Sequence, residues 1–91
     1  MKPLFELLKE KVSERIGERV FYTGEIYNII HRLSTERGKK INKMIIKNNL
    51  RAHRILPKDV ELNPRQYGFP DANVSLYPQG IVWNYLRELD L

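Results

Sequence analysis

The sequence predicts a small α+β domain that is mainly helical and carries a short β-hairpin. Apolar residues recur at spacings of three and four over much of the first half of the chain, as they do on the buried side of a helix. Two alternating polar and apolar stretches, residues 59–62 and 73–77, flank a loop rich in Pro, Gly, Asn and Asp. With 91 residues and no cysteine, we expect one domain over residues 1–91, stabilised by an apolar core without disulfides or zinc.

The expected helices cover residues 3–17, 24–37, 40–53 and 79–89, and the expected strands cover residues 19–22, 59–62 and 73–77. Pro3 suits the first position of the first helix, and Gly17 suits a left-handed cap at its end. Thr23 is the expected N-cap of the second helix. The strands 59–62 and 73–77 would pair antiparallel across their loop.

The final segment, residues 78–91, has two interpretations. As a strand, Ile81, Trp83 and Tyr85 would alternate after a turn at residues 78–80. As a helix, apolar residues would form one stripe that closes the core. We favour the helix, because YLRELDL has helical spacing and few β-branched residues.

Positive charge is concentrated in one segment, residues 37–58. This segment holds 8 of the 16 basic residues and none of the 11 acidic ones, which leaves 8 basic and 11 acidic residues elsewhere. If the segment is helical, its central cations fall within a band roughly 80° wide on one face. These cations are Lys40, Lys43, Lys47, Arg51 and Arg54. Such segregation indicates a polyanionic partner, although a basic, solvated helix face without a ligand has the same pattern.

Apolar residues on the same segment restrict how the helix can pack. Ile41, Met44 and Ile45 form one apolar patch, and Ile46 and Leu50 form another. The helix is therefore either contacted from two sides or interrupted at residues 48–49, where Asn tolerates a left-handed cap.

The stretch VFYTGEIYNIIHRLSTERGKKINKMIIKNNLRAHRI resembles the core of a winged helix-turn-helix domain, over about residues 19–56. The resemblance implies that residues 23–37 brace the DNA backbone while residues 40–54 enter the major groove. It also implies that the hairpin is the wing. Its tip would carry Arg65, with Tyr67 and Phe69 either stacked on bases or folded back onto the core.

We therefore expect a DNA-binding protein, a transcriptional repressor or accessory factor, that binds double-stranded DNA. With about five phosphate contacts, its affinity should fall with log salt at a slope of roughly −4 to −5. Trp83 and Tyr85 are one possible seam of a homodimer. The expected nucleic-acid contacts are Lys39, Lys40, Asn42, Lys43, Lys47, Asn48, Arg51, Arg54, Lys58 and Arg65, with Asn49 as a further candidate for base contacts.

Two other functions fit the same charge pattern. One is a phage-type inhibitor or adaptor that binds a host protein through the basic surface, and the other is a structured-RNA binder. Enzymatic activity is not expected, because His31 and His53 are isolated and no Gly-rich phosphate loop or nucleophile elbow occurs. We expect no cofactor, no metal, no membrane segment and a cytoplasmic location.

Overall fold

The first helix, α1, spans Leu4–Ile16 in the computed structural model, which describes residues 3–33, 40–69 and 74–89. Gly17 ends the helix in the left-handed conformation, with φ of +80°, and its N–H donates to the Ser13 carbonyl oxygen. This confirms the predicted cap, because glycine adopts positive φ without a steric penalty. The buried side of α1 carries Leu8 and Val12, which have no exposed surface.

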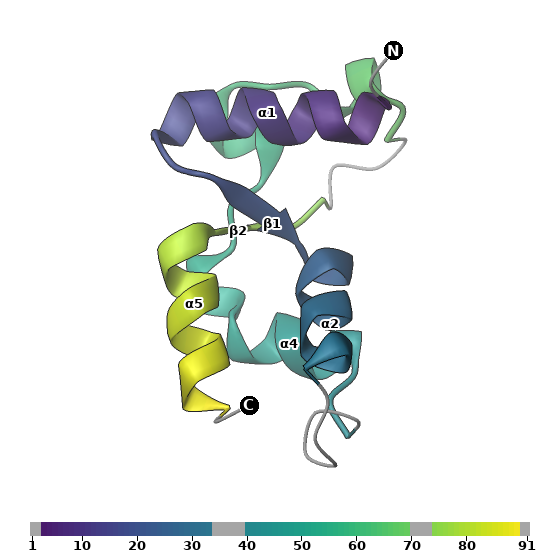
Figure 1. The fold of residues 1–91 in the computed structure, drawn as a ribbon. Helices are drawn as coiled ribbons and strands as arrows, with labels where there is room; N and C mark the ends of the chain where they lie inside the picture. Colours follow the sequence, from purple (N-terminus) through teal and green to yellow (C-terminus); the bar gives the residue numbers. More distant parts are fainter. Residues whose placement is uncertain (1–2, 34–39, 70–73, 90–91) are drawn as a thin grey trace.

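A two-stranded antiparallel sheet follows, formed by β1 (Val20–Tyr22) and β2 (Leu76–Pro78) (Figure 1). Phe21 lies opposite Tyr77, and Tyr22 lies opposite Leu76. Ile55 adds an isolated bridge on the other edge of β2, exchanging two backbone hydrogen bonds of 2.8 and 3.0 Å with Leu76.

The predicted strand 59–62 is wrong, and with it the predicted pairing of 59–62 with 73–77. Pro57–Val60 forms a 3₁₀ turn, η2, which ends at Glu61 with φ of +61°. Pro57 starts this turn, and Asp59 Oδ2 accepts the Leu56 N–H at 3.0 Å. Proline at the first position and a carboxylate that caps a free N–H both favour a helical turn over a strand.

The described residues form three further α-helices, α2 (Thr23–Arg32), α4 (Lys43–Asn49) and α5 (Gln79–Glu88). The helix preferred for the final segment is confirmed by α5. The second helix was predicted over 24–37, and its residues 34–37 lie outside the described residues. The expected N-cap at Thr23 is wrong: Tyr22 occupies that position, and Glu25 Oε1 accepts the Tyr22 N–H at 3.1 Å.

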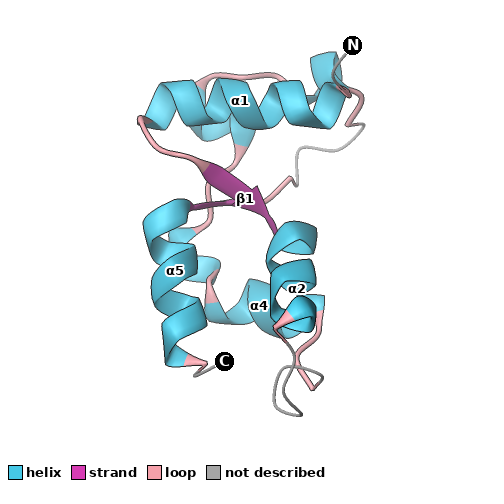
Figure 2. Cartoon of the chain, viewed as in Figure 1, coloured by secondary structure: helices cyan, strands magenta, loops and turns pink. Residues whose placement is uncertain are grey.

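The sheet separates two apolar clusters, which gives the molecule an elongated shape of 39 × 24 × 22 Å (Figure 2). The three-helix cluster lies among α2, α4 and α5, and its buried members are Phe21, Ile26, Ile30, Ile41, Ile46, Leu50, Tyr77, Val82, Tyr85 and Leu86. The α1 cluster contains Leu8, Val12, Val20 and Leu76, with η2 and a further 3₁₀ turn, η3 (Pro64–Tyr67), packed against α1.

Polar contacts connect α1 to the rest of the fold. Lys9 is only 8% exposed, and its Nζ lies 2.8 Å from Glu25 Oε2 on α2. The Tyr22 hydroxyl donates to the Phe5 carbonyl oxygen at 2.6 Å. These contacts fix the orientation of α1 relative to α2 and β1.

Among the described residues, no helix combines the length and apolarity needed to span a bilayer.

Candidate nucleic-acid interface

The cationic segment forms a short α-helix and a 3₁₀ turn, where one helix over 40–53 was predicted. Asn42 caps α4, because its Oδ1 accepts the Ile45 N–H at 2.9 Å. The helix ends at Asn49, and η1 (Arg51–His53) follows with hydrogen bonds between residues three apart. The expected left-handed Asn cap is absent, because the C-cap residue is Leu50, with φ of −105°, and neither Asn48 nor Asn49 has positive φ. The helix nevertheless stops at Asn49, as one alternative from the sequence predicted. Two consecutive Asn residues favour this stop, because they are poor helix formers.

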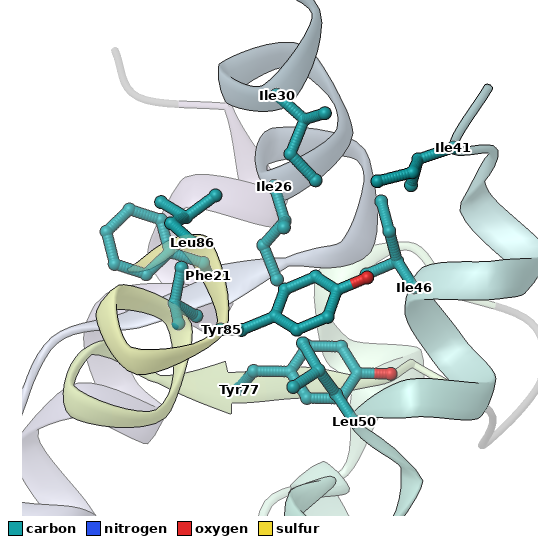
Figure 3. Packing of buried hydrophobic residues seen from close by; sticks show 10 residues of the cluster. Phe21, Ile26, Ile30, Ile41, Ile46, Leu50, Tyr77, Tyr85 and Leu86 are labelled. Atoms are coloured by element: carbon teal, nitrogen blue, oxygen red, sulfur yellow. The ribbon is translucent and has the colours of Figure 1, made fainter. Parts of the chain in front are cut away.

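Two neighbouring helices hold α4 in place. Ile41, Ile46 and Leu50 point into the three-helix cluster, toward α2 and α5 (Figure 3). Asn49 Nδ2 donates to the Tyr85 hydroxyl on α5 at 3.0 Å, and a hydrogen bond of 3.2 Å joins His31 Nε2 on α2 to the Ile41 carbonyl oxygen. The alternative in which both apolar patches are covered is wrong, because Ile41, Ile46 and Leu50 enter one cluster while Met44 and Ile45 stay exposed. Asn49, a candidate for base contacts, is already engaged within the protein.

Four of the predicted contact residues surround one small hollow of about 160 Å³ on the exposed side of this segment. They are Lys47, Asn48, Arg51 and Arg54, and each is exposed. Lys47 and Asn48 come from α4, Arg51 from η1, and Arg54 from the extended residue that follows. The change from α-helix to 3₁₀ turn thus keeps these four side chains together.

Ser75 and Tyr77 complete the lining of this hollow. Neither residue was predicted as part of the site, because nothing in the spacing of residues 37–58 points to a strand about twenty residues further along the chain. They reach the hollow because β2 lies beside Ile55, immediately after Arg54. We call this set of six residues the basic hollow.

Within the described part of the chain, the cations of residues 40–58 form no ion pair with a carboxylate. Among the described residues, ion pairs join Lys9 to Glu6 and Glu25, and Lys11 to Glu14, all on α1 and α2. No described carboxylate therefore neutralises the cations of residues 40–58, and this makes their charge available to an external anion.

The remaining predicted residues of α4 lie beside the basic hollow rather than in it. Lys40 is exposed ahead of the helix. The Lys43 Nζ lies 5.6 Å from the centre of the Tyr27 ring, a cation–π geometry that directs it toward α2. Lys39 lies outside the described residues. Met44 and Ile45 are exposed, at 71% and 37%, so the patch they were expected to form with Ile41 is divided.

Lys58 and Arg65 belong to the other half of the molecule. Both are exposed, on η2 and η3, which pack against α1. The expected wing tip is not an exposed aromatic loop. Tyr67 and Phe69 are partly buried against the α1 cluster, and the Phe69 ring stacks on Tyr22 at 6.4 Å. The alternative in which Tyr67 and Phe69 fold back onto the core is therefore the one that the structure shows.

The two residues of the expected dimer seam differ in exposure, because Tyr85 is buried and Trp83 is exposed. Tyr85 is 6% exposed and bonded to Asn49, so it is part of the core. Trp83 is 40% exposed, and its ring packs against Phe21 in a T-shaped arrangement with the ring centres 5.8 Å apart. In residues 3–33, 40–69 and 74–89, no group of three His, Asp or Glu side chains comes together as a metal site.

Comparison with known proteins adds no assignment. No protein-family model, no curated protein and no solved structure matches this chain. The interpretation of the basic hollow therefore depends on its own chemistry.

Proposed function

We propose that this protein binds double-stranded DNA through α4 and η1, as a transcriptional repressor or accessory factor. The observation that carries the proposal is the convergence of Lys47, Asn48, Arg51 and Arg54 around one hollow, with no ion pair to a described carboxylate. Arginine and lysine that are not paired internally bind phosphate oxygens and release the counterions condensed on DNA.

The outward side of α4 also offers groups that can contact bases. Asn48 is exposed beside the cations, and an Asn side chain can form two hydrogen bonds with adenine in the major groove. Met44 is the most exposed large apolar side chain described, at 71%. An apolar side chain at this place can pack on a thymine methyl group.

The order of elements supports a winged helix-turn-helix arrangement for this proposal. In the described part of the chain, the elements run in the order α1, β1, α2, α4 and η1, after which Ile55 returns to the sheet and forms its bridge with β2. In that arrangement α4 is the recognition helix. The segment that would form the wing differs, because η2 and η3 fold onto α1. Lys58 and Arg65 are then peripheral phosphate contacts.

The test is a salt titration of binding to a fluorescently labelled random-sequence duplex. Three to five phosphate contacts give a slope of about −3 to −5 in log affinity against log salt. The double variant Lys47→Ala/Arg51→Ala should make the slope shallower by about 2 and weaken binding about tenfold or more at low salt.

A matched control changes charge elsewhere. Lys11→Ala/Arg15→Ala removes the same two charges from α1, where Lys11 pairs with Glu14 on the exposed surface. It should leave the slope within about half a unit of the unmodified protein, since distant charges make no direct phosphate contact. Equal effects of the two double variants would refute a localised DNA-binding face. A structured RNA hairpin that displaces duplex DNA at equal concentration would instead identify RNA as the polyanion.

A further inference from the structure

The Tyr77 side chain leaves a polar atom without a partner inside the molecule. Tyr77 has no exposed surface, and its hydroxyl is one of two buried side-chain oxygens for which the described residues provide no hydrogen bond. Buried hydroxyls in native proteins almost always have a partner, and leaving one unpaired is costly. The exception therefore requires an explanation specific to this position.

The position of the ring is fixed by the sheet. Tyr77 is the central residue of β2, directly opposite Phe21, and its ring packs in the three-helix cluster beside Leu50. Its oxygen points toward α4 (Figure 3), and the residue forms part of the wall of the basic hollow. A phenylalanine would fill the same core volume. Core packing therefore does not require the Tyr77 hydroxyl, which lies on the side of the core that faces Lys47, Arg51 and Arg54.

All six side chains that line the hollow can donate hydrogen bonds. Lys47 supplies an ammonium group, Arg51 and Arg54 supply guanidinium groups, Asn48 an amide, and Ser75 and Tyr77 hydroxyls. Among the described lining residues there is no carboxylate. A group of donors with three positive charges fits a tetrahedral oxyanion, since Arg and Lys recognise phosphate in this way.

The size of the hollow limits the ligand. Its volume of about 160 Å³ is below the roughly 300–1,000 Å³ of pockets that enclose whole small molecules. One phosphate group fits this space, whereas a nucleotide with its base and sugar would project into solvent.

We propose that the basic hollow is a binding site for a single phosphate group, with the Tyr77 hydroxyl as its innermost donor. The phosphate is a backbone phosphodiester of the bound duplex, an identity that rests on the proposed function. Because the Tyr77 hydroxyl has no exposed surface in the free protein, the proposal requires side chains around the hollow to move before the oxyanion can reach it. One fixed phosphate then sets the register of α4 on the DNA backbone.

Tyr77→Phe separates this role from a structural one. The variant removes an unpaired hydroxyl and keeps the ring, so the free protein should be as stable as the parent or more stable. Binding to the duplex should weaken about tenfold, because hydrogen bonds to charged groups are the strong ones. The salt slope should not change, because no charge is lost. Tyr67→Phe, in the α1 cluster, is the matched control and should leave both stability and affinity close to those of the parent.

Inorganic phosphate tests the site without DNA. In two-dimensional NMR spectra, phosphate added at constant ionic strength should shift the backbone amides of residues 47–54 and 75–77, and Tyr77→Phe should reduce these shifts. Ser75→Ala provides a second variant that retains the charge and should have the same effect. If the parent protein shows no shifts at these residues, or if both variants respond like the parent, the phosphate site is refuted.

The two proposals fail in different ways. Phosphate-induced shifts at the hollow together with no duplex binding would refute the DNA function and keep the site, with free phosphate or a phosphate monoester as the ligand. Duplex binding with normal salt dependence that is insensitive to Tyr77→Phe and Ser75→Ala would keep the DNA function and refute the site.

Discussion

Replacing Lys9 with alanine should destabilise the fold far more than an ordinary surface substitution. The Lys9 side chain is 10% exposed, and its Nζ lies 2.8 Å from Glu25 Oε2 and 3.8 Å from Glu6 Oε2. Removing one partner of a buried pair costs about 3–5 kcal/mol, because the other charge stays buried without compensation. The Glu25 side chain is 33% exposed, so water partly replaces the ammonium group. We therefore expect a loss of about 2 kcal/mol.

Unfolding followed by circular dichroism, in urea and on heating, measures this loss. A change of about 2 kcal/mol lowers Tm by roughly 8–16 °C in a domain of this size. Lys11→Ala on the same helix is the control, because Lys11 is 52% exposed and lies 3.7 Å from Glu14. It should cost less than about 0.5 kcal/mol.

A double-mutant cycle isolates the contact between α1 and α2. Glu25→Gln retains an oxygen that can accept the Tyr22 N–H, whereas it removes the charge that faces Lys9. The two substitutions together should cost about 1 kcal/mol less than the sum of their separate effects. Strict additivity, or a Lys9→Ala variant as stable as Lys11→Ala, would show that this pair does not hold α1 in place.

Two further results are expected from the tyrosines. Tyr85→Phe should lower the free energy of unfolding in urea by about 1 kcal/mol, because Asn49 Nδ2 loses its acceptor. A variant as stable as the parent would show that water satisfies the amide equally well. Burial, together with the nearby charges of Glu25 and Glu6, raises the pKa of Tyr22 above its usual range. The unfolded chain then releases this proton first, so the contribution is fully present below about pH 10 and is lost progressively above it. The decline in unfolding free energy above pH 10 should be smaller in Tyr22→Phe, and an equal decline would exclude Tyr22 as its source.

The elements that depend on local signals were predictable from the sequence. The apolar spacing of α1 and its cap at Gly17 involve residues close together in the chain, and both were found where expected. The strand at 59–62 was not, because alternation of polar and apolar residues also fits a 3₁₀ turn that starts at proline. The partner of β2 proved to be β1, more than fifty residues away. No local pattern specifies such a pairing.

The candidate site was predictable to a similar extent. Segregated charge pointed to Lys47, Arg51 and Arg54, which the fold does bring together. The inner wall could not be predicted, because Ser75 and Tyr77 arrive through the pairing of β2 with Ile55 and β1. The polar bond between Asn49 and Tyr85 was equally hidden, since it joins α4 to a helix that follows about thirty residues later.

Both faces of the small sheet are covered, and this has a consequence for misfolding. Neighbouring residues of a strand point to opposite faces, so Tyr77 enters the three-helix cluster while Leu76 enters the α1 cluster. A shift of β2 by a single position along β1 would exchange these two side chains. Tyr77 would then enter the α1 cluster, which contains Leu8, and Leu76 would take its place beside the basic hollow. The register of the three residue pairs between β1 and β2 therefore determines both the packing of the two apolar clusters and the presence of the Tyr77 hydroxyl in the basic hollow.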